Sequence, residues 1–239
     1  MRAQGTLAPY TITKAHTVSK IPEEISFVDA AALPCAGYTA YEALYKKMKI
    51  VPDRTILIHG GSGGVGGFAI QLAKHVGLQV ITTASKENHD FVRSLGADEV
   101  IDYKQGMVND HVLSWTNGRG VDYILDTVSS QNATDSMSVL SYHGEIVTIP
   151  GRVDLNSVAP FTIAPSVHEV ALGAIHAYGS KEDQKSLRRM GSVMLELVRD
   201  GKLDPMVERV ISLEEAAQGM KDMKENRFRG KLVVSIEEE

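Results

Sequence analysis

A strand, a glycine-rich turn and an amphipathic helix follow one another near residue 60, and this succession constrains the fold more than any other feature. The run TILI (55–58) is apolar and β-branched, and it leads into HGGSGGVGG (59–67). Apolar residues then recur at the spacing of one helix face, at Val65, Ala69, Leu72, Ala73 and Val76. This order is typical of the first strand–helix–strand unit of an α/β domain.

Apolar strands and helical patterns keep alternating after this unit. Strands are expected at 78–83, 98–102, 121–126, 144–149 and 170–175, with helices around 91–95, 106–116 and 130–141 between the first four of them. Strands joined through helices need right-handed crossovers, which gives a mostly parallel sheet with helices on both faces. The sequence therefore predicts a doubly wound α/β domain, the Rossmann architecture.

The two ends of the chain show other patterns. Residues 10–18 are expected to be extended, and residues 26–49 form an alanine-rich helical stretch that breaks at Pro34. A long helix is expected through Leu187, Met190, Met194 and Leu197, ended by Gly201 and Pro205. Beyond it the pattern predicts a strand at 207–211, a helix at 213–223 and a strand at 231–236.

Charge and composition limit the classes of partner. The net charge is −5, and no dense run of Lys and Arg offers a surface for nucleic acid or an anionic membrane. No apolar run reaches the length of a membrane span, and the N-terminal residues lack the apolar core of a signal peptide. The single cysteine, Cys35, fits a reducing compartment. We expect a cytoplasmic protein that binds neither nucleic acid nor membrane.

The glycine turn also fits a hydrolase. As G-x-S-x-G it would make Ser62 a nucleophile, with Asp126 as the acid and His143 or His168 as the base. Such a nucleophile needs only the glycines beside it, whereas the turn here has a longer stretch of bare backbone. The hydrolase is therefore the less favoured interpretation.

In two further interpretations, the glycine turn binds a dinucleotide. As G-x-x-x-G-x-G the turn suits a short-chain dehydrogenase, which needs a downstream Tyr-x-x-x-Lys; the one such spacing, Tyr45 to Lys49, lies upstream. As G-x-G-x-x-G, with Gly61, Gly63 and Gly66, it is the fingerprint that lets a pyrophosphate approach the N-terminus of a helix. We favour this third interpretation.

The residues after the second strand indicate which dinucleotide is bound. NAD sites place an acid about 20 residues after the glycines, to bind the ribose 2′-hydroxyl. Here the second strand runs into Ser85 and Lys86, and the first acid is Glu87. Because a serine and a lysine attract a 2′-phosphate, we expect NADP rather than NAD. The alternative is that Ser85 only caps the next helix.

Several stretches together resemble a known superfamily. They are AALPCAGYTAYEAL (31–44), ILIHGGSGGVGGFAIQLAK (56–74), SLGADEVIDY (94–103), GVDYILDTV (120–128) and RGKLVV (229–234). In this order and spacing they resemble the medium-chain dehydrogenase/reductase superfamily, most closely its zinc-independent quinone oxidoreductase-like branch.

The resemblance implies a domain organisation. Residues 1–24 would be the residual end of a GroES-like catalytic domain, 25–202 the NAD(P)-binding Rossmann domain, and 203–239 the return to the catalytic domain. A domain-sized segment precedes these residues in relatives. We therefore expect a truncated member that binds the cofactor with impaired catalysis.

The resemblance also implies cofactor contacts. The glycine turn would hold the pyrophosphate, the residues after the second and third strands the adenosine end with its 2′-phosphate, and the loops after the fourth and fifth strands the nicotinamide. The implied residues are Thr39, Gly60, Gly61, Ser62, Gly63, Gly64, Val65, Gly66, Ser85, Lys86, Tyr103, Thr127, Val128, Pro150, Gly151, Arg152 and Lys231. The resemblance identifies no catalytic acid.

The implied reaction is hydride transfer from NADPH to a small electron acceptor, such as a quinone, an enone or another carbonyl compound. Cys35 matches a zinc ligand of alcohol dehydrogenases in this superfamily, but a buried structural cysteine is the favoured interpretation, and we expect no metal. The alternatives are a non-catalytic NADP-binding redox sensor and a zinc-dependent alcohol dehydrogenase. Relatives pair through the sixth strand, so we expect a homodimer joined at about 168–177, with Leu172 in mid-strand.

Overall fold

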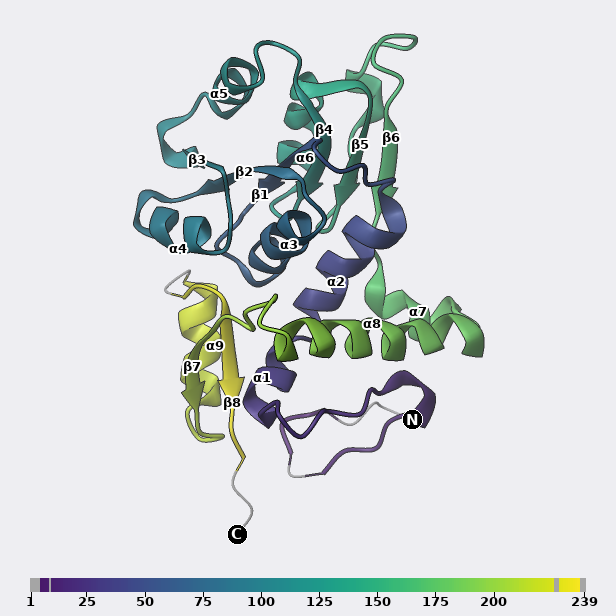
Figure 1. Cartoon of the computed structure of the whole chain (residues 1–239), viewed down its shortest axis with the longest axis vertical. Helices are drawn as coiled ribbons and strands as arrows, with labels where there is room; N and C mark the ends of the chain where they lie inside the picture. Colours follow the sequence, from purple (N-terminus) through teal and green to yellow (C-terminus); the bar gives the residue numbers. More distant parts are fainter. Residues whose placement is uncertain (1–4, 9, 226–227, 237–239) are drawn as a thin grey trace. The chain divides into compact units, whose positions relative to one another are not determined.

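The computed structural model describes residues 5–8, 10–225 and 228–236, in two compact units (Figure 1). Residues 39–172 form the sheet unit, and residues 1–38 with 173–239 form the flanking unit. This division differs from the predicted boundaries, because residues 25–38 and 173–202 fall into the flanking unit. The assignment of the flanking segments to a GroES-like domain stays a prediction, and the ends of both segments lie outside the described residues.

The sheet unit confirms the predicted Rossmann fold. Its described residues contain a six-stranded sheet in the order β3-β2-β1-β4-β5-β6, and every neighbouring pair is parallel. The strands are β1 (Thr55–His59), β2 (Gln79–Ala84), β3 (Glu99–Asp102), β4 (Val121–Asp126), β5 (Leu140–Thr148) and β6 (Ser166–Glu169). The helices that connect them are α3 (Gly64–His75), α4 (His89–Ser94), α5 (Val108–Trp115) and α6 (Ser130–Ser136). Helix α2 (Ala36–Glu42) precedes β1 and continues as a π-helical turn at Ala43–Lys47.

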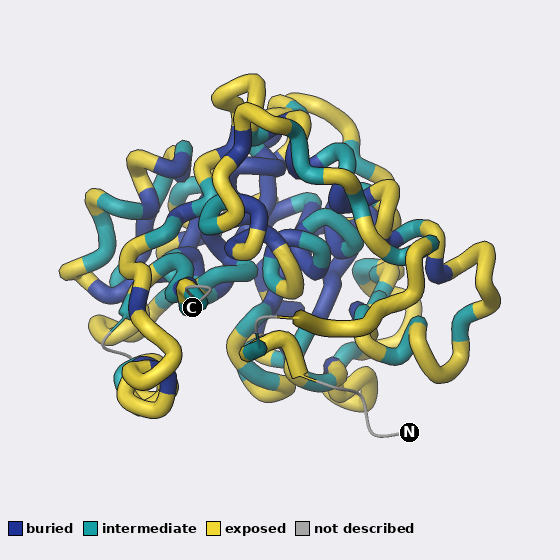
Figure 2. The backbone as a smooth tube through the Cα atoms, turned by 90° about the horizontal axis from the view of Figure 1, so that it is seen from below, coloured by how far each residue is buried: buried dark blue, intermediate teal, exposed yellow. Residues whose placement is uncertain are grey.

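The core lies on both faces of this sheet, at the buried residues of its central strands, and buried backbone is dark blue in Figure 2. On one face, residues of neighbouring strands pack with α5 and α6; they include Leu57, Ile81, Ile124, Ile146, Val112 and Ala133. The alternate positions Ile56 and Ile58 are also fully buried, and α3 contacts β1 and β2. Each fully buried Leu or Ile side chain contributes about 1.5–3 kcal/mol, which explains the continuous apolar character of these strands.

Glycines end two of the helices as their positions predict. Gly77 follows α3 with φ +79°, and the Leu78 N–H donates to the Ala73 carbonyl at 3.0 Å. Gly201 follows α8 (Lys181–Arg199) with φ +65°, and the Lys202 N–H donates to the Leu197 carbonyl at 2.8 Å. Both are Schellman ends, which need a left-handed residue that glycine supplies at low cost.

The predicted position of the sixth strand is wrong. Strand β6 is Ser166–Glu169, whereas residues 172–174 form a 3-10 turn and Ile175–Tyr178 form α7. The run VALGAI is apolar but rich in Leu and Ala, which favour a helix as readily as a strand. The strand is nevertheless an edge of the sheet, and Leu172 lies outside it.

The flanking unit combines helices with a small sheet. Its elements are α1 (Phe27–Ala32), α7, α8, α9 (Ala216–Lys224), β7 (Val207–Ile211) and β8 (Lys231–Val234), and β7 pairs with β8 in parallel. Ser180 and Asp183 form a capping box at the start of α8. The predicted extended piece at 10–18 is interrupted, because Ala15–Thr17 form a 3-10 turn closed by the Thr17 N–H on the Lys14 carbonyl at 2.9 Å.

Among the described helices, none is both long and apolar enough to cross a lipid bilayer.

Candidate functional site

The glycine turn lies where the order of the strands reverses. Strand β1 pairs with β2 on one side and with β4 on the other, so the chain leaves the carboxyl end of β1 at the switch point of the sheet. Open α/β sheets bind ligands in the crevice outside this point. The turn at 60–63 and the first residues of α3 stand there.

Two glycines of the turn are required by close packing. A Cβ on Gly61 would lie 2.1 Å from Thr82 Oγ1, and a Cβ on Gly66 would lie 2.2 Å from the Gly60 carbonyl oxygen. Gly63 differs, because it is exposed and its Cβ would meet only the Gly60 carbonyl oxygen, at 3.4 Å. The turn is therefore closely packed against the sheet and bare on its outer side at Gly63.

The start of α3 offers hydrogen-bond donors to an anion. The first backbone bond of the helix runs from the Gly67 N–H to the Gly63 carbonyl at 2.9 Å, and no side chain caps the helix. The N–H groups of Gly64, Val65 and Gly66 precede it, in the turn where a helix has no acceptor of its own. Together with the bare backbone at Gly63, these donors fit the pyrophosphate of a dinucleotide.

A buried histidine joins the glycine turn to its neighbours. His59 ends β1 with 3% of its surface exposed; its Nδ1 lies 3.4 Å from Thr83 Oγ1, and its Nε2 lies 2.9 Å from Ser136 Oγ. The Gly60 N–H donates to the same Thr83 hydroxyl at 3.1 Å. Burial lowers the pKa of His59, against the opposing charge of Asp126, so the imidazole is neutral near pH 7.

Asp126 organises the loop after β4. Its side chain is fully buried, and Oδ1 accepts the N–H groups of Val128 at 2.8 Å and Ser129 at 3.0 Å. The amide of Asn132 donates to its other oxygen. The Thr127 hydroxyl then donates to the His59 carbonyl at 2.7 Å. This loop is therefore fixed beside the glycine turn.

The loop after β5 packs against the loop after β4. The Arg152 N–H donates to Ser130 Oγ at 3.1 Å, and the Thr148 hydroxyl donates to the Gly151 carbonyl at 2.6 Å. The Arg152 guanidinium is paired with Glu169 at 2.8 Å. The structure thus brings the glycine turn, Thr127, Val128 and the segment 150–152 together, and their contacts with a cofactor stay a prediction.

The predicted adenosine-end residues lie at the carboxyl ends of β2 and β3. The Gly61 N–H donates to the Thr83 carbonyl at 3.0 Å, which puts the end of β2 beside the turn. Ser85 is 6% exposed and accepts the Asn88 amide at 3.1 Å, rather than capping the backbone of the next turn; Lys86 is exposed. Tyr103 follows β3, the neighbour of β2, and is 53% exposed.

Two further residues were implied as cofactor contacts, Thr39 and Lys231. Thr39 is buried on α2, and its place beside a nicotinamide stays a prediction. Lys231 begins β8 in the flanking unit, where burial lowers its pKa and the nearby Cys35 opposes that shift. Cys35 is exposed, which corrects the expectation of a buried cysteine. In the described residues, no three His, Cys, Asp or Glu side chains gather as metal ligands would.

The hydrolase interpretation gains no support from this geometry. The Asp126 carboxylate accepts from Val128, Ser129 and Asn132, not from His143 or His168. His143 lies exposed in β5, and His168 in β6 stands 3.5 Å from Glu145. The proposed acid and base are therefore not hydrogen-bonded to each other.

Sequence reasoning missed the polar network of His59, Thr83, Asn132 and Ser136. These residues lie on β1, β2 and α6. A single sequence does not show which side chains of such distant segments meet in the fold. One signal was available, because His59 and Asp126 are each a polar residue at the end of an apolar strand.

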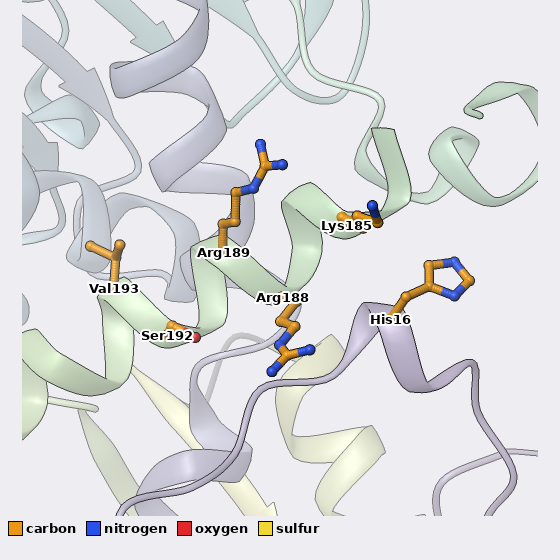
Figure 3. A pocket seen from close by; sticks show the side chains of 6 residues that line it. All are labelled: His16, Lys185, Arg188, Arg189, Ser192 and Val193. Atoms are coloured by element: carbon orange, nitrogen blue, oxygen red, sulfur yellow. The ribbon is translucent and has the colours of Figure 1, made fainter. Parts of the chain in front are cut away.

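The flanking unit has a pocket of its own, of about 450 Å³ (Figure 3). It is lined by His16, Lys185, Arg188, Arg189, Ser192 and Val193. Arg188 and Arg189 point to opposite sides of α8 in Figure 3, and the Glu182 carboxylate pairs with Lys185 at 2.7 Å and with Arg189 at 2.8 Å. Arg188 and Arg189 therefore point apart, and Glu182 partly neutralises Lys185 and Arg189. The pocket contains none of the predicted cofactor residues.

Comparison with known proteins agrees with the fold. A family model described as zinc-binding dehydrogenase matches residues 95–234. The chain is 31% identical to the mitochondrial NAD(P)H oxidoreductase RTN4IP1 of Mus musculus, over 98% of this chain and 62% of that protein. It is 29% identical to a quinone oxidoreductase of Sus scrofa, over 97% of this chain and 70% of that protein.

A solved structure has a similar fold. It is an alcohol dehydrogenase superfamily protein from Novosphingobium aromaticivorans, 28% identical, with a TM-score of 0.87 over 98% of this chain and 72% of that chain. The chain thus spans about two thirds of the length of these relatives.

Proposed function

Because the chain belongs to the zinc-binding dehydrogenases of the medium-chain dehydrogenase/reductase superfamily, we propose that it binds a nicotinamide dinucleotide at the glycine turn and serves an oxidoreductase reaction. The observation that carries this proposal is the outer side of the turn, where Gly63 is bare and no side chain caps the N-terminus of α3. The relatives are named quinone oxidoreductases and NAD(P)H oxidoreductases, which favours a nicotinamide over other dinucleotides.

Each part of the site has a role in this proposal. The backbone of the turn binds the pyrophosphate, and Ser85 and Lys86 bind the 2′-phosphate. The loops at 127–128 and 150–152, held by Asp126 and Ser130, orient the nicotinamide side. The bound dinucleotide supplies a hydride for a small electron acceptor such as a quinone, an enone or another carbonyl compound.

Binding of NADPH in preference to NADH tests the proposal. We expect the chain to bind NADPH more tightly, and we expect Lys86→Glu to weaken NADPH binding by about 1–3 kcal/mol, since a charge-assisted contact becomes a repulsion. NADH is the matched control, because it lacks the 2′-phosphate and should bind both proteins alike. Calorimetric titration measures both nucleotides. Equal affinities for NADPH and NADH would contradict the 2′-phosphate site, and no binding of either would contradict the function.

We also propose a homodimer formed at the edge of β6. The Val170 N–H donates to the Thr148 carbonyl of β5 at 3.2 Å. Backbone groups alternate along a strand, so the N–H groups of Val167 and Glu169 point away from β5, toward the free edge. A second copy can add its own β6 there about a two-fold axis.

Proline at Val167 tests this edge. We expect Val167→Pro to convert the dimer into a monomer, because it removes an outward donor and leaves the bonds to β5 in place. Light scattering gives the mass, and circular dichroism checks that the variant is folded. A monomeric unmodified protein, or a folded variant that stays dimeric, would place the interface elsewhere or remove it.

A further inference from the structure

The first acid after β2 is held by a lysine from the neighbouring loop. Glu87 stands in the 3-10 turn Lys86–Asn88 after β2, and Lys104 stands in the 3-10 turn Tyr103–Gln105 after β3. Strands β2 and β3 are paired up to Ala84 and Asp102, so these two turns lie next to each other. The Lys104 ammonium meets the Glu87 carboxylate at 3.0 Å.

This ion pair stands at the proposed 2′-phosphate site. Glu87 follows Ser85 and Lys86 directly, and the Ser85 hydroxyl lies against its carboxylate. A backbone hydrogen bond, Lys104 and Ser85 together lower the pKa of Glu87 to about 2, so the carboxylate is charged at every physiological pH. The hydrogen bond between Lys104 and Glu87 in turn raises the pKa of Lys104.

The charges near Ser85 are balanced only because Lys104 is present. Lys86 and Lys104 are the two cations of these turns, and Glu87 and Asp102 are the two anions. Asp102 caps its own turn by accepting the Lys104 N–H at 3.0 Å. Without the Lys104 side chain, the carboxylates of Glu87 and Asp102 would outnumber Lys86, the one cation left on these turns, and a nearby 2′-phosphate would be repelled.

We propose that Lys104 determines cofactor specificity by neutralising Glu87, which lets Ser85 and Lys86 accept a 2′-phosphate although an acid follows them. This inference rests on the proposed function and deepens it. Lys104 acts here through Glu87 rather than by binding the phosphate itself. Its removal should therefore harm NADPH binding only while the Glu87 carboxylate is present.

A double-mutant cycle tests this dependence. The variants are Lys104→Gln, Glu87→Gln and the two combined, and each is titrated with NADPH and NADH at low salt. We expect Lys104→Gln to weaken NADPH binding about fivefold, with NADH changed less than about twofold, because the pair is exposed and its charges are partly screened. The combined variant should bind NADPH within about twofold of the unmodified protein. Both side chains are exposed, so melting temperatures should stay close to that of the unmodified protein.

The outcomes separate this inference from the proposed function. Unchanged NADPH affinity in Lys104→Gln would overturn the inference while leaving the function in place. A loss that persists in the combined variant would also overturn it, because Lys104 would then bind the phosphate directly. An unmodified protein that binds neither nucleotide would overturn the proposed function, and the inference with it.

Discussion

Replacing Gly66 with alanine should abolish nucleotide binding and lower the free energy of unfolding by about 3 kcal/mol or more. The new Cβ would lie 2.2 Å from the Gly60 carbonyl oxygen and 2.8 Å from its carbon. Both atoms belong to the backbone, so no side-chain rotation relieves the overlap, and α3 has to move away from β1. Thermal denaturation and titration with NADPH measure the two losses.

Gly63→Ala is the matched control on the same turn. Its Cβ would meet only the Gly60 carbonyl oxygen, at 3.4 Å, and its φ of −79° and ψ of 169° suit alanine. We expect its stability to stay within about 1 kcal/mol of the unmodified protein, while NADPH binds at least about tenfold less tightly, because the methyl group would stand where the pyrophosphate passes. Unchanged stability of Gly66→Ala, or full NADPH affinity of Gly63→Ala, would contradict this account of the turn.

The first five strands could be predicted because a parallel sheet covered on both faces needs apolar residues throughout. Runs such as 55–58 and 121–126 stand out for this reason, and every residue of β1 is buried. The glycine turn was recognised because a strand, a glycine-rich turn and a helix follow one another, which is the order that lets a pyrophosphate approach the N-terminus of a helix. The helix ends at Gly77 and Gly201 were read from the conformations that only glycine adopts easily.

Strand β6 could not be found in the same way, because it is an edge strand with exposed ends. Its sequence, SVHE, has one strongly apolar residue, and its burial pattern is mixed. The apolar run that follows it looked like a better strand, but Leu172 and Ala174 belong to a 3-10 turn. Because none of its four residues is fully buried, the strand leaves too weak a pattern to separate strand from helix.

The contacts that hold the candidate site together could not be predicted from the sequence, for a different reason. His59 and Ser136 are 77 residues apart, and Glu87 and Lys104 are 17 apart. Pattern and propensity describe neighbours along the chain, whereas these pairs form only when the strands are placed in order. The residues that would touch the cofactor were implied by the resemblance to a known superfamily, and the residues that hold them in place were not predicted.

After Gly66→Ala, the substitution that we expect to reduce stability and NADPH binding most is the removal of the Asp126 carboxylate. We expect Asp126→Ala to lower the free energy of unfolding by about 3 kcal/mol, since three part-buried donors lose a charged acceptor and one hydrogen bond to a charged group contributes about 1.5–3 kcal/mol. These donors are the N–H groups of Val128 and Ser129 and the amide of Asn132. The loop at 127–129 should then move, and NADPH should bind more weakly even where the protein remains folded.

Two further variants separate hydrogen bonding from charge. Asp126→Asn keeps an oxygen for the Val128 and Ser129 N–H groups but replaces the charged acceptor of Asn132 by a neutral amide, so that Asn132 has to turn its own amide to pair with it, and we expect a loss of about 1–3 kcal/mol. Adding Asn132→Asp restores a charged acceptor to the pair and moves the charge by one side chain. The double variant should therefore be more stable than Asp126→Asn alone by denaturant unfolding. If Asp126→Ala unfolds like the unmodified protein, the carboxylate does not hold the loop; if the double variant gains nothing, Asn132 is not its partner.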